Sequence, residues 1–87
     1  MKQIKKYSAV SWNCPGCNQL QAMLDTINTS DKIMHVDIDS LSRTELQSTK
    51  IRSVPVLIAY SEDGSEAGRI NGVPTKEALE KFIAAYI

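Results

Sequence analysis

The sequence has no excess of charge of either sign, no long apolar run and very few cysteines. Ten lysine and arginine residues balance ten aspartate and glutamate residues, so it lacks the basic surface that nucleic acid phosphates require, and no nucleic acid partner is expected. The longest mainly apolar run, Val54 to Tyr60, is far too short to span a membrane, and no membrane partner is expected. The early lysines Lys2, Lys5 and Lys6 are not followed by an apolar block. We therefore expect no secretory signal, and we expect a cytoplasmic location.

The size and composition predict one folded domain over residues 1–87. A chain of 87 residues has room for one domain. Its share of hydrophobic residues, 43%, and of charged residues, 23%, is ordinary for a globular protein. We expect the chain to act as a monomer.

Both cysteines lie in one short motif, Cys14-Pro15-Gly16-Cys17, where a short strand-like segment gives way to a helix-like one. If Cys14 sits at the start of the helix, its sulfur faces backbone N–H groups that have no partner within the helix. These groups and the helix dipole favour the thiolate, which is the nucleophile. Cys17 follows almost one helical turn later and can reach the first sulfur. The motif thus predicts a redox-active pair in which Cys14 attacks a disulfide and Cys17 resolves the mixed disulfide.

Other interpretations of the cysteine pair remain open on the motif alone. Free cysteines are often buried in protein cores. A zinc site needs four ligands, and His35 is the only other good candidate, so no metal is expected in a site built from this chain alone. A structural disulfide across two residues closes too small a loop to stabilise much. No cofactor is expected beyond the Cys14–Cys17 disulfide itself.

The first half of the chain predicts a strand, a helix and a second strand. Residues 3–10 form a weak strand pattern, followed by a helix that Cys14 caps and Pro15 opens. The apolar residues at helical spacing that should face the core are Cys17, Leu20, Leu24 and Ile27, with Met23 adjoining. Residues 28–31 form a turn. Residues 33–38 alternate, which places Met34, Val36 and Ile38 on one face and Ile33 and His35 on the other, wetter face.

The second half predicts a short helix, a hairpin and a final helix. Ser42 and Glu45 match a capping box, which opens a helix that runs to about Lys50 with Leu46 inward. The apolar run 54–60 suits a central strand covered on both faces, and residues 62–65 form a turn to a last strand at 66–70. Gly72 is expected at positive φ or in a close approach. Thr75 caps the last helix, whose core face carries the residues Leu79, Phe82, Ile83 and Tyr86.

The order of the predicted elements is β-α-β-α-β-β-α. Two parallel strands joined by a helix, followed by a hairpin, predict an α/β protein with a mixed four-stranded sheet and helices on both faces.

These features together resemble the thioredoxin superfamily over nearly the whole chain. The resemblance depends on the Cys-Pro-Gly-Cys motif, on Gly72 before the last helix, and on residues 51–57, Ile-Arg-Ser-Val-Pro-Val-Leu, which are similar to the I-R-G/S-x-P-T-L signature of thioredoxins. It implies a thioredoxin-like fold with a cis Val54–Pro55 bond that faces the redox pair. It also implies a small thiol–disulfide oxidoreductase that carries electrons from a thioredoxin-type reductase to protein disulfides.

The sequence departs from the family at several points, and these departures leave two alternative functions open. The chain begins without the extra strand and helix of full-length thioredoxins, so its size is similar to that of glutaredoxins. Ser8 stands near the place of the buried aspartate with which thioredoxins transfer protons. Residues 71–75 lack the acidic pair with which glutaredoxins bind glutathione. The alternatives are a glutathione-dependent glutaredoxin and a non-enzymatic protein of this fold that binds a metal or a partner.

The resemblance also implies a surface that binds the substrate around the redox pair. Pro55 would shape a groove in which the backbone of Val54 pairs with an extended substrate. The other residues expected to contact the substrate are Trp12, Pro15, Gly72 and Val73.

Overall fold

A four-stranded mixed sheet lies at the centre of the computed structural model, which describes residues 3–9, 14–27 and 33–86. The strands are β1 (Gln3–Ser8), β2 (Ile33–Asp37), β3 (Val56–Tyr60) and β4 (Glu66–Asn71). Their order across the sheet is β2-β1-β3-β4. β1 is parallel to β2 and antiparallel to β3, and β3 is antiparallel to β4.

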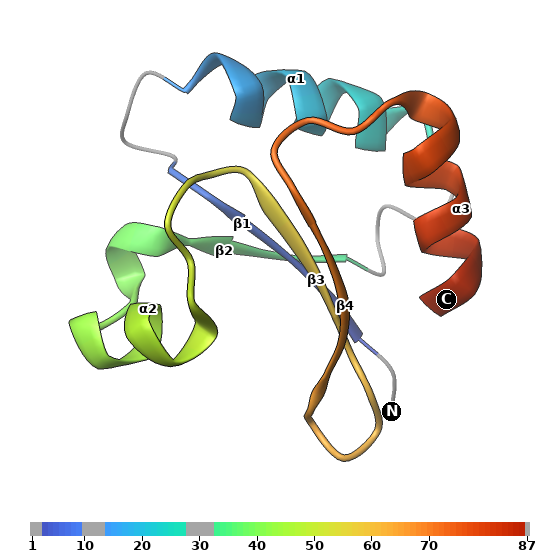
Figure 1. Ribbon diagram of the computed structural model, residues 1–87. Helices are drawn as coiled ribbons and strands as arrows, with labels where there is room; N and C mark the ends of the chain where they lie inside the picture. The colour runs from blue at the N-terminus through green and yellow to red at the C-terminus, as the bar shows by residue number, and fades with distance from the viewer. Residues whose placement is uncertain (1–2, 10–13, 28–32, 87) are drawn as a thin grey trace.

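Helices cover both faces of this sheet, as Figure 1 shows. The helices are α1 (Pro15–Asp25), α2 (Arg43–Thr49) and α3 (Lys76–Tyr86), and a short 3₁₀ turn, η2 (Ile38–Ser40), precedes α2. α1 and α3 lie together on one face, and α2 lies at the other. The predicted α/β class and the element order β-α-β-α-β-β-α are confirmed.

The larger part of the core lies between the sheet and the two helices α1 and α3. Leu20 and Leu24 of α1 and Leu79 of α3 are fully buried there against Leu57 of β3. The predicted helical faces are therefore confirmed, because the helix positions that repeat every three or four residues are the ones that meet the sheet.

A smaller core lies on the opposite face, beside α2. Tyr7, Val56 and Ile58 are buried there, and Leu41 and Ile51 at the ends of the α2 segment pack against them. Because side chains alternate along a strand, β3 supplies both cores and has no exposed face. The prediction of a central strand covered on both sides is confirmed.

The ends of several elements differ from the predicted ones. β3 begins at Val56 rather than at residue 54, because the proline at 55 has no N–H to donate to a neighbouring strand. β2 ends at Asp37, whose side chain accepts a hydrogen bond from the Asp39 N–H and so starts the η2 turn. The capping box of Ser42 and Glu45 and the cap from Thr75 are present as predicted. The predicted turn at residues 28–31 lies outside the described residues.

The predicted faces of β2 are wrong at its first two residues. Ile33, assigned to the wetter face, is only 4% exposed and belongs to the larger core. Met34, assigned to the buried face, is 47% exposed. β2 is an edge strand, and the short α2 does not reach far enough along it to cover Met34. Alternation identifies two faces of a strand, but it does not reveal how far the neighbouring helix covers each of them.

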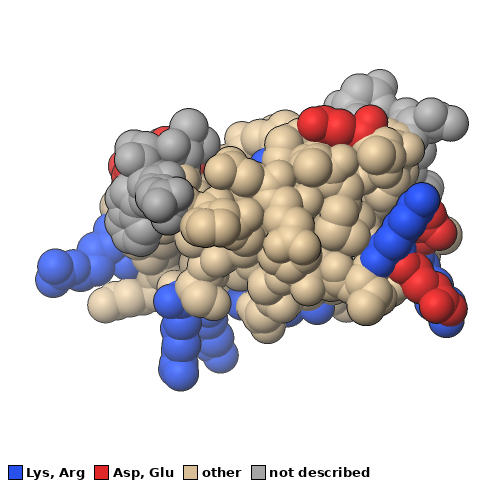
Figure 2. Space-filling model, turned by 90° about the horizontal axis from the view of Figure 1, so that it is seen from above, with Lys and Arg blue, Asp and Glu red and all other residues tan. Residues whose placement is uncertain are grey.

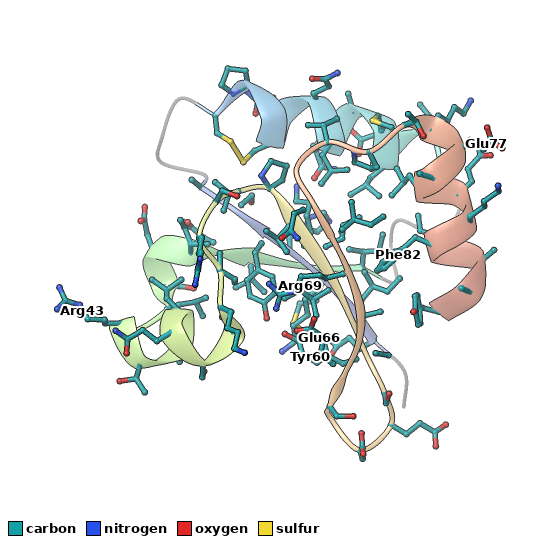
Figure 3. The ribbon with its side chains drawn as sticks, in the orientation of Figure 1. Arg43, Tyr60, Glu66, Arg69, Glu77 and Phe82 are labelled. Carbon is teal, nitrogen blue, oxygen red and sulfur yellow. A yellow bond between two sulfur atoms is a disulfide. The ribbon has the colours of Figure 1, made fainter. Side chains whose placement is uncertain are left out.

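Arg69 of β4 connects the sheet to the end of α2. Its guanidinium donates hydrogen bonds to the backbone oxygens of Thr49 at 2.6 Å and Lys50 at 3.3 Å. It also pairs with Glu66 at 2.6 Å, and the two side chains lie close together beside Tyr60 in Figure 3. The last carbonyl groups of a helix have no partner within it, so Arg69 satisfies groups that would otherwise need water. This contact anchors the segment that leads from α2 to Pro55.

Gly68 of β4 allows α3 to approach the sheet closely. A Cβ atom at this position would lie 2.5 Å from Oη and 3.0 Å from Cζ of Tyr86. The Tyr86 hydroxyl in turn donates a hydrogen bond of 3.2 Å to the Ala67 carbonyl. The last turn of α3 is therefore held against a strand that has no side chain at the point of contact.

We predict that Gly68→Ala destabilises the protein by about 1–3 kcal/mol, because the added methyl group overlaps the Tyr86 ring. Chemical denaturation measures the change in the free energy of unfolding. In a Tyr86→Ala background the same substitution should cost much less, because the overlapping ring is gone. An equal cost in both backgrounds would contradict this account of Gly68.

Candidate functional site

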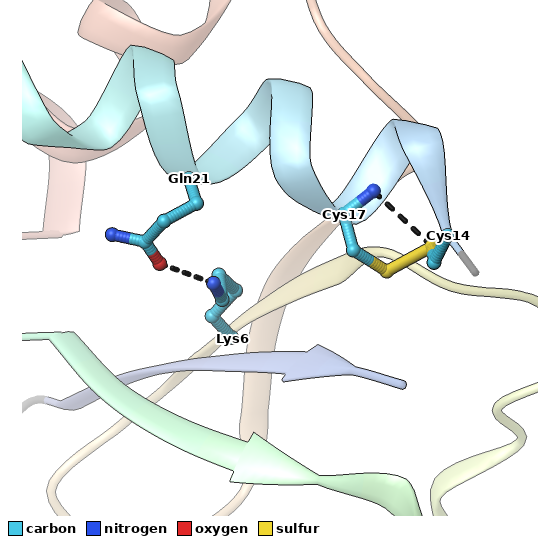
Figure 4. Close-up of a disulfide and its surroundings, with 4 residues drawn as sticks. All are labelled: Lys6, Cys14, Cys17 and Gln21. Carbon is cyan, nitrogen blue, oxygen red and sulfur yellow. Dashed lines mark hydrogen bonds between the residues drawn. A yellow bond between two sulfur atoms is a disulfide. The ribbon is translucent and has the colours of Figure 1, made fainter. Parts of the chain in front are cut away.

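Cys14 and Cys17 form a disulfide at the first turn of α1, with their Cα atoms 5.3 Å apart. Cys14 is the N-cap residue, and its Sγ accepts a hydrogen bond of 3.2 Å from the Cys17 N–H, drawn in Figure 4. Its carbonyl accepts the first helical bond, from the Asn18 N–H at 3.2 Å. Pro15 follows at the first helical position, where its missing N–H is not needed. The predicted cap and helix start are confirmed.

The two sulfurs differ in burial. Cys17 is 6% exposed and is one of the buried residues of α1, with Leu20 and Leu24, whereas Cys14 is half-buried at the start of the helix. A donor N–H and the positive end of the helix both stabilise negative charge on the Cys14 sulfur. The Cys14 sulfur is therefore accessible and lies where negative charge is stabilised, and the Cys17 sulfur is sheltered and within bonding reach of it.

Gly16, between the cysteines, allows two loops to approach the helix start. A Cβ at Gly16 would lie 3.3 Å from Cδ of Pro55 and 3.4 Å from Cγ2 of Val73. The first distance is shorter than most Cβ contacts and the second is an ordinary van der Waals contact, so this turn of α1 lies close against the loops before β3 and after β4. A glycine between the two cysteines leaves space beside them. Which residues fill that space depends on the tertiary fold.

A hydrogen bond joins these two loops to each other. The Gly72 N–H donates to the Pro55 carbonyl at 2.9 Å, and Gly72 adopts a φ of +79°, as predicted for this glycine. The Val54–Pro55 peptide bond is cis, as the resemblance implied. Pro55 is buried and Val54 is half-buried.

The structure thus brings together most of the residues that the sequence predicted for the site. Pro15 and Val73 are exposed next to the disulfide, and Pro55 and Gly72 lie behind them. Trp12, which was predicted to flank the same groove, lies outside the described residues. Figure 2 looks down on the face that carries α1 and these loops. The middle of that face is mostly without charged side chains, and both basic and acidic side chains lie around its edge.

One buried charge near the disulfide was missed by the sequence analysis. Lys6 of β1 is only 5% exposed, and its Nζ donates a hydrogen bond to Oε1 of Gln21 on α1. Burial lowers the pKa of the Lys6 ammonium from its usual value, and the Asp25 carboxylate partly offsets that effect. Lys6 was named from the sequence only as one of three early lysines. The available signal was its alternation with Ile4 and Ser8, which groups the three residues on one face of β1. Only the tertiary structure shows that α1 covers this face.

His35 lies beside Lys6, because these two residues are register partners on the adjacent strands β1 and β2. Burial lowers the pKa of His35, and the nearby Lys6 charge lowers it further, while Asp25 opposes both. His35 is exposed, as predicted.

Among residues 3–9, 14–27 and 33–86, no group of three or more His, Cys, Asp or Glu side chains is arranged to hold a metal ion. In the same described segments, no helix is both long enough and apolar enough to cross a membrane.

The chain belongs to the family of thioredoxin-like domains, whose family model matches residues 7–87. This match includes the disulfide, the loop with Pro55 and the last helix. A comparison with curated protein sequences finds no match.

Solved structures of thioredoxins have the same fold. The thioredoxin of Malassezia sympodialis has a TM-score of 0.77 at 19% identity, covering 98% of this chain and 74% of that one. A mutant thioredoxin from Halobacterium salinarum has a TM-score of 0.76 at 20% identity, with the same two coverages of 98% and 74%. The germline-specific thioredoxin Deadhead of Drosophila melanogaster has a TM-score of 0.78 at 16% identity, covering 99% of this chain and 81% of that one. Together with the Cys14–Cys17 disulfide, the family supports a thiol–disulfide oxidoreductase.

We predict that alkylation of the reduced protein near neutral pH labels Cys14 first, by tenfold or more in rate. The Cys14 sulfur is more accessible, and the N–H groups of the first turn stabilise its thiolate. Brief treatment with iodoacetamide, followed by peptide mass spectrometry, measures the two rates. The fully denatured protein is the control and should show nearly equal labelling. Preferential labelling of Cys17 in the folded protein would reverse the assignment.

Proposed function

We propose that this protein reduces disulfides in other proteins through its Cys14–Cys17 dithiol. One observation carries the proposal: the half-buried Cys14 caps α1 within bonding reach of the sheltered Cys17. The apolar surface of Pro15 and Val73 adjoins this pair. The disulfide itself is the redox group, and no further cofactor is proposed.

The proposed reaction moves two electrons from the dithiol to the substrate. The Cys14 thiolate attacks one sulfur of a substrate disulfide, forms a mixed disulfide and releases the first substrate thiolate. The Cys17 thiolate then attacks the Cys14 sulfur, which restores the Cys14–Cys17 disulfide and releases the second substrate thiolate. Water or buffer supplies the protons that the substrate thiolates take up. A thioredoxin-type reductase would return two electrons and two protons to the protein.

The substrate is proposed to be an extended protein segment. Val54 precedes the buried Pro55 and lies before the start of β3, so its backbone groups are outside the ladder of the sheet. Such groups can pair with the backbone of an extended ligand. Pro15 follows Cys14 and Val73 lies near Gly16, so both exposed side chains offer apolar contact near the disulfide. From the sequence pattern, Trp12 is proposed as a further contact.

A glutathione-dependent cycle is the second candidate, and one hydrogen bond weighs against it. A glutathione carboxylate would need donors near the disulfide, yet the Gly72 N–H is already donated to the Pro55 carbonyl. Pro74 has no N–H to offer, and residues 71–75 contain no acid to hold the glutathione amine. Each missing contact costs on the order of 1 kcal/mol, and a tripeptide has few contacts to lose.

The proposed setting follows from the same features. We propose a monomer that acts in the cytoplasm, with protein disulfides and a thioredoxin-type reductase as partners. A non-enzymatic role in metal binding has no additional ligand cluster among the described residues to support it. Neither nucleic acid nor a membrane is proposed as a partner.

We predict that Cys17→Ser accumulates mixed disulfides with protein substrates, because the attacking thiol remains and the resolving thiol is lost. Cys14→Ser should form none at neutral pH, because the remaining sulfur is buried. Non-reducing gels with a disulfide-bonded protein such as insulin measure the trapped species. Equal trapping by both variants would contradict the assigned roles.

We also predict fast insulin reduction when a thioredoxin reductase and NADPH recycle the protein, and at least tenfold slower turnover when glutathione and glutathione reductase replace them. Turnover is followed by NADPH consumption. Fast reduction of a small glutathione mixed disulfide that survives Cys17→Ser would instead establish the glutaredoxin cycle.

A further inference from the structure

Lys6 is the charged side chain that the fold buries beneath the helix of the redox pair. Among the described residues, the buried polar side chains are Lys6 and Ser8, both at 5% exposure and both on the face of β1 that α1 covers. Removing an ammonium group from water is costly unless it has polar partners. The protein provides two such partners on α1, the Gln21 amide oxygen and the more distant Asp25 carboxylate. A buried charge with a dedicated partner, next to a redox centre, suggests a role beyond packing.

The helix places this charge close to Cys17. Cys17 and Gln21 are four residues apart, so they are neighbours on one face of α1. Figure 4 shows both side chains on the side of α1 that faces the sheet, with Lys6 extending from β1 to meet Gln21. Cys17 and Gln21 are about one helical turn apart, and the Gln21 side chain reaches the Lys6 ammonium. This ammonium therefore lies on the order of 10 Å from the Cys17 sulfur. The space between them is protein interior, where screening by solvent is weak.

The other charged groups around Lys6 do not cancel this field at Cys17. Asp25 is exposed and lies eight residues from Cys17, about 12 Å along the helix axis, beyond Gln21. Gln21 Nε2 donates to Oδ1 of Asp25 at 2.7 Å, which keeps that carboxylate on the far side of the amide. His35 on β2 has a pKa below its usual value of about 6.5 and is neutral at pH 7. The partner of Lys6 on β3 is the apolar Leu57.

We propose that the buried Lys6 ammonium stabilises the thiolate form of Cys17 and so sets the pH at which Cys17 can resolve the mixed disulfide between Cys14 and a substrate. Lys6 is a positioning residue, because it contacts Gln21 and acts on the sulfur through the interior. This role rests on the proposed function, in which Cys17 resolves the mixed disulfide. Lys6 exchanges no proton in the step: the Cys17 thiolate attacks Cys14, the substrate thiolate leaves, and water protonates the leaving group.

The expected size of the effect follows from the distance. A unit charge about 10 Å away, in an effective dielectric constant of about 20, shifts a pKa by roughly one unit. Removing it should lower the Cys17 thiolate fraction near neutral pH about tenfold. A thiolate of higher pKa is a better nucleophile, with a Brønsted coefficient of about 0.4–0.5, so the resolving step should slow by only about threefold.

The test compares Lys6→Met with the matched control Lys5→Met, each in a Cys14→Ser background where Cys17 is the one thiol that titrates. Lys5 adjoins Lys6 on the same strand but points to the opposite face, where its ammonium lies over the Tyr60 ring. Methionine keeps the length of the chain and suits a buried site, so both variants should fold, which circular dichroism and thermal unfolding check. Thiolate absorbance and iodoacetamide rates measured against pH give the Cys17 pKa.

We expect Lys6→Met to raise the Cys17 pKa by about one unit and Lys5→Met to change it by less than about 0.3. An unchanged Cys17 pKa in Lys6→Met, or equal shifts in both variants, would overturn the proposal and leave Lys6 with a structural role. This titration needs no substrate. If the shift is found but the wild-type protein fails to reduce insulin, the proposed function fails while the electrostatic role of Lys6 stands.

Discussion

The close contact between the first turn of α1 and two loops is the constraint on which the site depends. A Cβ atom at Gly16 would meet Pro55 and Val73, and the Gly72 N–H joins the second loop to the first. A side chain at Gly16 would require Pro55 or the helix start to shift by a few tenths of an ångström. Pro55 leads directly into β3, a strand that both cores cover. Because Gly16 has no side chain, the Cys-Pro-Gly-Cys turn can lie against the loops that flank β3 and β4 of the sheet.

The rest of the fold supports this contact from both ends. Arg69 holds the last carbonyls of α2 and so anchors the segment that enters Pro55. Gly68 lets Tyr86 close the far end of α3 onto β4, while Leu79 fixes the near end in the larger core. The loop after β4 is therefore held between a strand and a helix that are both packed. The related thioredoxin structures are longer, but the elements that carry the site are present here and pack against one another.

The charge environment beneath the helix is the clearest individual feature of this chain. The face of β1 below α1 carries Ile4, Lys6 and Ser8, so the buried charge there is a cation. A cation stabilises a thiolate, whereas a carboxylate in the same region would oppose it. In our proposal the two thiolates thus have different sources of stabilisation: the helix start for Cys14, and the buried Lys6 ammonium for Cys17.

The sequence by itself determined the elements and the chemistry of the cysteine pair, because these depend on neighbours in the chain. Helical spacing, the capping box at Ser42 and the Cys-Pro-Gly-Cys motif all act over a few residues, and each of them was predicted and found. The tertiary structure alone decided what depends on distant segments. Alternation could not show that Met34 lies on an uncovered edge, or that Lys6 lies under a helix, because both facts depend on where α1 and α2 end over the sheet. The neighbours of Gly16 are likewise set by packing, since Pro55 and Val73 are dozens of residues away in sequence and reach it only when the sheet has formed.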